Sequence, residues 1–325
     1  HFSFFPEKVS HTKKITMRST SHTIKRKKSL NSHKFICKIC GDNELVIVFM
    51  GKIRDGVPGK LTSSNHKVFQ CSKCSVRFLE KFAPQELYES KAYRKKFSGS
   101  SQLDDFRYAH DELLNNKIQR IGIHNCRNKV VADFGAGGGS FLDALQGFAK
   151  KTIAIEPARH WHKEIKKKHL VFSYGKEISE AKIKIDIGIS FDVIEHVPSP
   201  ENYLKEIRDS LKKTGRLFLM TPNTNELLFD LDKRNFEPFY YRTAHSYYFC
   251  KDSIKFLLER TGFKNIEIGF CHEMDISNLI FWLKEGKPTG KNKNKLFDDV
   301  ANQYFCSYLE KIGKASHLWI NAERG

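Results

Sequence analysis

From residue 129 onward, short apolar runs alternate with segments that have the pattern of helices. The runs have the length and composition of strands: Val130–Phe134, Thr152–Ile155, Leu170–Tyr174, Ile185–Phe191 and Arg216–Thr221. Helices are predicted between them, at Phe141–Phe148, Ala158–Lys168 and Pro200–Lys212. This order is typical of a parallel sheet covered by helices on both faces. We therefore predict a doubly wound α/β domain over residues 129–325, with its ligand site beyond the carboxyl ends of the strands.

The chain ahead of this domain has a different pattern. Residues 1–34 are polar, basic and aperiodic, and we expect a disordered tail. The chain opens on His1, so we expect either a fragment or a translated upstream extension. In the second case Met17 is the candidate initiator, and residues 1–16 are the extension. Residues 83–128 predict a helical linker, with one helix after Cys74 and a second from Asp104 to about Arg120. These helices are expected to bridge the two domains and to roof the ligand pocket.

Composition narrows the class of protein. Hydrophobic residues make up 40% of the 325 residues, which is enough for a sizeable core. No apolar run approaches the roughly 18 residues that cross a bilayer, and no secretory signal is recognised, so we expect a cytoplasmic protein without a membrane span. The net charge of +19 fits scattered surface lysines, an acidic or phosphorylated substrate, or nucleic acid.

Two Cys-x-x-Cys pairs predict a metal site. Cys37 and Cys40 form the first pair, and Cys71 and Cys74 form the second. Two intervening residues let both thiolates face one ion, and two such knuckles give a closed tetrahedral site that is structural in zinc proteins. Disulfides are the alternative, but they are rare in the cytosol. We predict a zinc-ribbon-like module over residues 35–82, with zinc on the four cysteines and a hairpin between the pairs; His66 is at best a substitute ligand.

A glycine-rich turn follows the first strand of the α/β domain. It reads Asp133-Phe134-Gly135-Ala136-Gly137-Gly138-Gly139. Glycines let the backbone turn tightly and approach a ligand closely. A dinucleotide site would need a further glycine where Ser140 stands, and a kinase reading of the Asp-Phe-Gly tripeptide fails because the other kinase motifs are missing. Glu156 ends the next strand, where a carboxylate can bind ribose hydroxyls.

These motifs together resemble a known family. DFGAGGGSF, IAIEP, ISFDVIEHVPSPENYLKEIRDSLKKTGRLFLMTPN and LLERTGFKNIEI look like the successive motifs of class I S-adenosylmethionine (SAM)-dependent methyltransferases over residues 129–270. The resemblance implies a Rossmann-like seven-stranded sheet whose last strand is antiparallel, with Phe263–Gly269 and His317–Asn321 as the final hairpin and a helical insertion between them. It also implies a set of cofactor-binding residues: Asp133, Phe134, Gly135, Gly137, Glu156, Tyr174, Phe191 and Asp192.

A four-cysteine module before such a domain resembles a group of methyltransferases that act on nucleotide-linked sugars and surface polysaccharides. The segment YYRTAHSYYF is similar to a stretch of that group in which a Glu-His pair lines the substrate pocket. Here His245 is present and Ala244 replaces the glutamate, so C-methylation loses its proton-abstracting pair and O-methylation stays open. We predict His196 and His245 as catalytic residues, because histidine titrates near neutral pH and can accept a hydroxyl proton. Tyr108 and His110 are secondary candidates, and Glu195 is expected to orient its neighbour.

Two other functions remain open at this point. An RNA methyltransferase would use the zinc module and a basic surface to hold RNA, although few stacking aromatic residues surround the cysteines. A non-catalytic binding protein could share the fold, but the intact glycine turn and Glu156 argue against it. The favoured acceptor is therefore a small molecule or glycan.

Overall fold

The computed structural model describes residues 35–288 and 296–325. The tail predicted for residues 1–34, and residues 289–295 of the loop rich in Lys and Asn, lie outside the described residues. Within the described part, no helix has the length and apolarity to span a bilayer.

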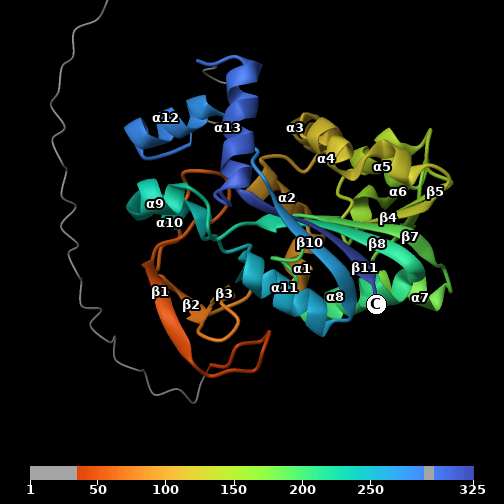
Figure 1. Ribbon diagram of the computed structural model, residues 1–325, viewed down its shortest axis with the longest axis horizontal. Helices are drawn as coiled ribbons and strands as arrows, with labels where there is room; N and C mark the ends of the chain where they lie inside the picture. Colours follow the sequence, from red (N-terminus) through yellow and green to blue (C-terminus); the bar gives the residue numbers. More distant parts are fainter. Residues whose placement is uncertain (1–34, 289–295) are drawn as a thin grey trace, which may run out of the picture. The chain divides into compact units, whose positions relative to one another are not determined.

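The larger sheet has seven strands in the order β10-β11-β8-β7-β4-β5-β6. The strands from β6 to β8 pair in parallel, whereas β11 is antiparallel to both β8 and β10. This arrangement confirms the predicted fold class, including the reversed last strand (Figure 1). The strands are β4 (Val130–Phe134), β5 (Lys151–Ile155), β6 (Leu170–Phe172), β7 (Ile185–Phe191), β8 (Leu211–Pro222), β10 (Phe263–Cys271) and β11 (His317–Arg324).

Alternate residues of these strands enter two separate cores. On β4, Phe134 packs on one face and Val131 on the other, as expected for side chains with a period of two. One face is covered by α7 (Gly175–Glu180), α8 (Pro200–Ser210) and α11 (Lys251–Arg260). The other is covered by α4 (Leu114–Ile121), the 3₁₀ turns η1 (Ile123–Cys126) and η2 (Arg159–Trp161), α5 (Ser140–Leu145) and α6 (His162–Ile165).

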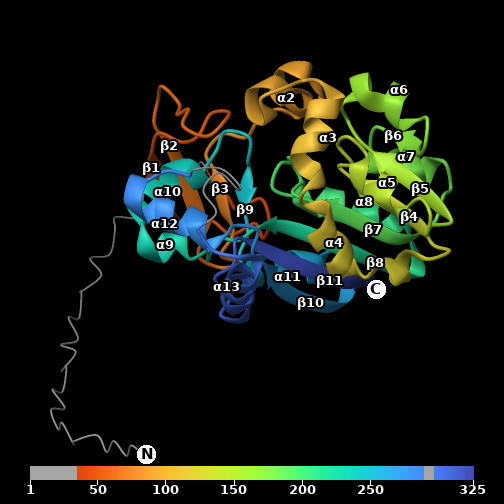
Figure 2. The same ribbon diagram turned by 90° about the horizontal axis from the view of Figure 1, so that it is seen from above.

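The smaller sheet combines three strands that precede the α/β domain with one strand from within that domain. Its order is β1 (Leu45–Gly51), β2 (His66–Cys71), β3 (Arg77–Leu79) and β9 (Tyr247–Tyr248). The predicted hairpin between the cysteine pairs is β1–β2. Strand β9 comes from the segment YYRTAHSYYF and pairs with β3, as Figure 2 shows. The sequence did not predict this pairing, which joins the cysteine module to the α/β domain.

One apolar core runs from the small sheet into the large one. Phe69 and Phe78 of the small sheet belong to the same buried cluster as Tyr247, Phe249 and Leu257. Burial of a large aromatic side chain is a major stabilising contribution, so the cysteine module and the large sheet stabilise each other.

Four helices cross from the small sheet to the large one, where the linker was predicted. They are α1 (Gln85–Glu89), α2 (Lys91–Ser98), α3 (Leu103–Asp111) and α4. The predicted helix 104–120 is therefore interrupted, and its halves have different anchors. Helix α3 packs against α5, whereas Arg120 of α4 bonds to the Phe270 carbonyl (3.1 Å) and to Glu310.

The predicted helical insertion before the last strand is present in the described residues. It contains α12 (Ile276–Glu285) and α13 (Asp299–Lys311). A second helical insertion, after β8, contains α9 (Leu228–Leu231) and α10 (Lys233–Tyr240). Trp282 of α12 packs on Phe236 and Phe239 of α10, so the two insertions share an aromatic core.

Candidate active site

The glycine turn at the end of β4 adopts backbone conformations that favour glycine. Gly135 has φ +94° and Gly137 has φ +54°. A Cβ at Gly135 would lie 2.3 Å from Cγ2 of Val193, and one at Gly137 would lie 2.8 Å from the ring of Phe106. The turn therefore brings bare backbone against its neighbours and opens into a cavity at the sheet edge.

Glu156 connects the glycine turn to the end of β5. Its Oε2 accepts the Gly137 N–H (2.8 Å), and its Oε1 accepts the Ala158 N–H (2.8 Å). The side chain is only 1% exposed. A buried carboxylate needs such donors to compensate for lost hydration, so Glu156 fixes the geometry of both loops.

Arg94 of α2 covers the same carboxylate. Its Nη2 lies 3.0 Å from Oε1 of Glu156. The guanidinium also stacks on Trp161 (4.7 Å to the ring centroid) and Phe106 (5.0 Å). This charge-assisted bond and the ring contacts hold α2 over the edge of the sheet at the end of β5; α2, α3 and α4 together form the roof of the site.

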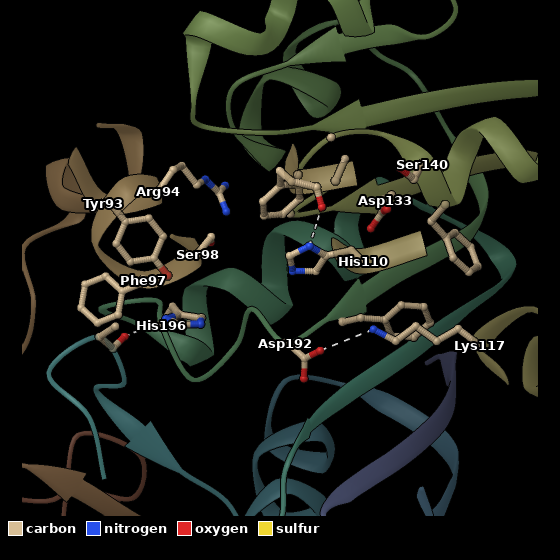
Figure 3. Close-up of a pocket in the computed structure, with 18 of the residues that line it drawn as sticks. Tyr93, Arg94, Phe97, Ser98, His110, Lys117, Asp133, Ser140, Asp192 and His196 are labelled. Carbon is tan, nitrogen blue, oxygen red and sulfur yellow. Dashed lines mark hydrogen bonds and ion pairs between the residues drawn. The ribbon is translucent and has the colours of Figure 1, made fainter. Parts of the chain in front are cut away.

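Three further charged side chains, Lys117, Asp133 and Asp192, line the cavity at this edge of the sheet. Lys117 of α4 lies 3.5 Å from Asp192, which follows β7 with φ +57° (Figure 3). Burial alone would lower the pKa of Lys117, but the negative charges of Asp192 and Glu273 outweigh it and raise this pKa. Asp133 is also buried, which raises its pKa to about 7 against the opposing effect of Lys117. Asp133 is therefore partly protonated near neutral pH, and a cation bound beside it would favour its ionised form.

Two cavities meet at Gly135. The roofed cavity, about 310 Å³, lies under α2, α3 and α4 and is lined by Arg94, His110, Lys117, Asp133 and Asp192 (Figure 3). The apolar cavity, about 380 Å³, lies beyond β5 and β6 and is lined by Ile155, Pro157, Tyr174 and Val193. Gly135 borders both cavities, and the two adjacent spaces suit a ligand with one polar and one flat apolar end.

His196 is oriented by a backbone carbonyl. Its Nδ1 lies 2.7 Å from the Ala244 oxygen, which requires the proton on Nδ1 and leaves the lone pair on Nε2. Tyr88 donates to the same carbonyl (2.8 Å). Burial lowers the pKa of His196 to about 4, so the ring is neutral at pH 7. A neutral ring with a free Nε2 can accept a proton.

His245 and Glu195 complete a cluster with His196. The His196 and His245 rings meet edge to face at 4.5 Å, and Glu195 Oε1 lies 3.9 Å from Nε2 of His196. Burial lowers the pKa of His245 well below its usual value, whereas burial and Asp192 raise the pKa of Glu195 to about 8. One ligand atom from each residue lies within 4.8 Å of the others, so this set could hold a proton or a divalent cation.

A third cavity lies on the far side of these histidines. The aromatic cavity, about 640 Å³, is lined by Phe236, Phe239, Tyr240 and Trp282, and also by His196 and His245. It shares four residues with the roofed cavity: Arg54, Asp192, His196 and Arg242. The candidate cofactor and acceptor spaces therefore adjoin at His196.

The residues predicted for the cofactor gather at this edge of the sheet. Asp133, Gly135, Gly137, Phe191 and Asp192 line the roofed cavity, and Phe134 and Tyr174 line the apolar cavity. Glu156 lines neither cavity; it is buried and bonds to the N–H of Gly137, which lines the roofed cavity. His110 lines the roofed cavity, whereas Tyr108 is 82% exposed.

Sequence reasoning missed four cations that line the roofed cavity: Arg54, Arg94, Lys117 and Arg242. Arg242 lies within the segment that yielded His245, but a single arginine in a basic chain gave no signal.

The four cysteines form a separate cluster in the small-sheet region. Their sulfur atoms lie within 4.8 Å of one another, with Cys37–Cys74 at 3.6 Å and Cys40–Cys71 at 3.4 Å. A disulfide would need about 2.05 Å. Tetrahedral zinc with Zn–S bonds of about 2.3 Å separates its sulfurs by roughly 3.8 Å, so the cluster fits that ion.

Comparison with known proteins identifies the family. A family model described as a methyltransferase domain matches residues 106–268, half of the chain. The chain belongs to the methyltransferase domain family. The match includes the glycine turn, Glu156, and the loop that carries Asp192 and His196.

Individual relatives of this methyltransferase domain are distant. A ubiquinone biosynthesis O-methyltransferase from Pelagibacter ubique is 25% identical over 126 residues, 36% of this chain and 52% of the relative. A tRNA U34 carboxymethyltransferase from Aeromonas hydrophila is 27% identical over 204 residues, 58% of this chain and 56% of the relative. The chain spans about half the length of these relatives. A solved SAM-dependent methyltransferase from Archaeoglobus fulgidus is similar at 18% identity and TM-score 0.48, over 71% of this chain and 98% of that one.

The glycine turn predicts a test of the site's architecture. Gly135→Ala should destabilise the chain by more than about 1 kcal/mol, because alanine is strained at positive φ and its Cβ would clash with Val193. Gly147→Ala is the matched control, since its Cβ would meet nothing within 4 Å. Thermal melts of both variants measure the difference; equal melting temperatures would contradict this account of the turn.

Proposed function

We propose that this methyltransferase domain transfers the methyl group of SAM to a small-molecule or glycan acceptor. The observation that carries the proposal is the junction at Gly135, where two cavities meet next to the buried Glu156. Membership in the methyltransferase domain family supports the same activity.

The residues at the junction suit the parts of SAM. Glu156 would accept hydrogen bonds from the ribose hydroxyls, and the apolar cavity beside Tyr174 would take the adenine. Asp133 and Asp192 in the roofed cavity would face the amino group of the methionine part. Arg94 now occupies Glu156 Oε1, so it has to release that oxygen for ribose to bind, and it can then pair with the methionine carboxylate.

Methyl transfer needs a positioned nucleophile and a proton acceptor. When bound, SAM supplies an electrophilic methyl group on sulfur. His196 would take the proton of an acceptor hydroxyl on Nε2, because the Ala244 carbonyl holds the other ring nitrogen as a donor. Glu195 accepts the Thr221 hydroxyl at 2.9 Å; a positive charge on His196 would favour its ionised form, which would then stabilise the imidazolium. His245 is the alternative base.

The favoured acceptor class is a sugar, in particular a nucleotide-linked sugar. The aromatic cavity adjoins His196 and combines aromatic walls with polar groups, which suits a polar ring with apolar faces. Ala244 in place of an acid next to His245 favours methylation of a hydroxyl over methylation of carbon.

An RNA acceptor is the second candidate. The net charge of +19 and the similarity to a tRNA U34 carboxymethyltransferase favour it. Turnover on nucleotide sugars, phosphorylated glycans and RNA, measured side by side, separates the two.

We also propose that Cys37, Cys40, Cys71 and Cys74 hold one structural zinc ion. Free thiolates are maintained in a reducing compartment, which is consistent with a cytoplasmic protein. The shared core of the two sheets makes this ion part of the stability of the entire described fold.

The first functional prediction concerns Glu156. Glu156→Gln should weaken SAM binding at least about tenfold, because charge-assisted hydrogen bonds contribute roughly 1.5–3 kcal/mol. Glu164→Gln, at an exposed helix position, is the control. Calorimetric titration of folded protein measures both; unchanged affinity of Glu156→Gln would remove Glu156 from the cofactor site.

The second concerns His196. His196→Ala should lower kcat roughly a hundredfold or more, the usual scale for loss of a general base, and leave SAM affinity nearly intact. His124→Ala, at an exposed position, is the control and should behave as wild type. Poor SAM binding or early melting of His196→Ala would instead make this residue structural and favour His245 as the base.

The third concerns the metal. Freshly purified, reduced protein should contain one zinc per chain, and Cys71→Ser should lose it and lower the melting temperature reported by Trp161, Trp282 and Trp319. These tryptophans lie outside residues 35–82, so they report on the remainder of the chain. Cys306→Ser is the thiol control. Metal-free wild type, or a Cys71→Ser protein that melts as wild type does, would refute the zinc assignment.

A further inference from the structure

Two arginines lie side by side where the roofed cavity and the aromatic cavity meet. Arg54 and Arg242 are partners in an isolated parallel β-bridge. The Arg54 N–H donates to the Tyr241 carbonyl (3.0 Å), and the Thr243 N–H donates to the Arg54 carbonyl (3.0 Å). Paired strands are about 4.8 Å apart, so the two side chains leave the backbone close together. Both line both cavities.

Neither guanidinium has an anionic partner among the described residues. Arg54 is 7% exposed, and the Nε atoms of both arginines are buried without a hydrogen bond. The Arg54 guanidinium stacks on Phe239, 4.6 Å from the ring centroid. The neighbouring acid, Asp55, is committed elsewhere, to Lys96 (2.6 Å) and the Thr243 hydroxyl (2.7 Å).

This arrangement is unfavourable without a ligand. Burial and the adjacent Arg242 lower the pKa of Arg54 to about 8. Glu195 and Glu226 also line the aromatic cavity, but neither forms an ion pair with these arginines, and burial raises the pKa of each to about 8. Two adjacent cations, of which Arg54 is buried and neither forms an ion pair with a described acid, suit a bound anion.

We propose that Arg54 and Arg242 bind a phosphoryl group of the methyl acceptor. The planar fork of each guanidinium matches phosphate oxygens in a bidentate manner. A phosphoryl group carries about −1.5 to −2 charge at pH 7 and can balance two arginines, whereas a carboxylate balances only one. This inference rests on the proposed function, and it adds which residues bind the phosphoryl group that a nucleotide-linked sugar carries.

The position of the pair also constrains how the acceptor enters. His196 lies at the same junction of the two cavities, so a phosphoryl group held there anchors the acceptor beside the proposed base. Binding of this non-reacting phosphoryl group would position the acceptor hydroxyl for reaction beside His196.

Inorganic pyrophosphate is the probe for this site. At constant ionic strength it should raise the melting temperature of the wild-type chain, and sodium acetate should not, because a ligand of the native state stabilises it by mass action. Arg54→Met and Arg242→Met should bind pyrophosphate at least about tenfold more weakly, the effect expected for a lost charged hydrogen bond. Lys91→Met, an exposed position on α2, should respond as wild type does.

A second measurement separates a ligand site from a structural role. Without ligand, Arg54→Met should melt no lower than wild type, because methionine keeps the contact with Phe239 and removes an unpaired buried charge. Both arginine variants should still bind SAM by calorimetry, which shows that the fold around the cofactor cavity is intact. Pyrophosphate that stabilises wild type and variants equally, or does not stabilise wild type, would overturn the phosphoryl site. Failure of wild type to bind SAM would instead overturn the proposed function and leave the pyrophosphate result interpretable.

Discussion

The site depends on one buried carboxylate. Glu156 accepts backbone N–H groups from the glycine turn and from the loop after β5, and it pairs with Arg94 from the helical roof. These three partners come from separate stretches of the chain, so the carboxylate fixes how the roof lies on the sheet edge. A buried charge without such partners would be costly, which explains why the structure satisfies both oxygens. The same oxygens are those that the proposed cofactor needs, so binding and roof position are coupled.

The strands, helices and turns that depend on neighbouring residues in the sequence could be predicted. Short apolar runs between helical segments located the parallel strands, and the turn from Asp133 to Gly139 followed from glycines placed between a strand and a helix. Arg94, Lys117, Arg54 and Arg242 were not predictable, because each reaches the cavities only through tertiary packing, and the chain has 56 Lys and Arg residues. The two-residue strand β9 was missed for a similar reason: its pairing with β3 is long-range, and its aromatic sequence has no alternation.

The small sheet contributes to both stability and chemistry. Strand β3 pairs with β9, and the segment before β9 carries Arg242 and Ala244, whose carbonyl orients His196. The loop after β1 brings Arg54 next to Arg242. An ion on the four cysteines would therefore stabilise the substrate side of the site without contacting it, because it would hold β2 and β3 in place. Such an ion would give the four-cysteine module a structural role in this methyltransferase domain.

The central claim is that Glu156 exchanges Arg94 for the cofactor ribose. The most direct measurement is a crystal structure of the complex with S-adenosylhomocysteine. The account predicts that both ribose hydroxyls lie within hydrogen-bond distance of the Glu156 carboxylate and that Arg94 has left its present position 3.0 Å from Oε1. A complex in which Arg94 keeps this ion pair while the ribose binds elsewhere would contradict it.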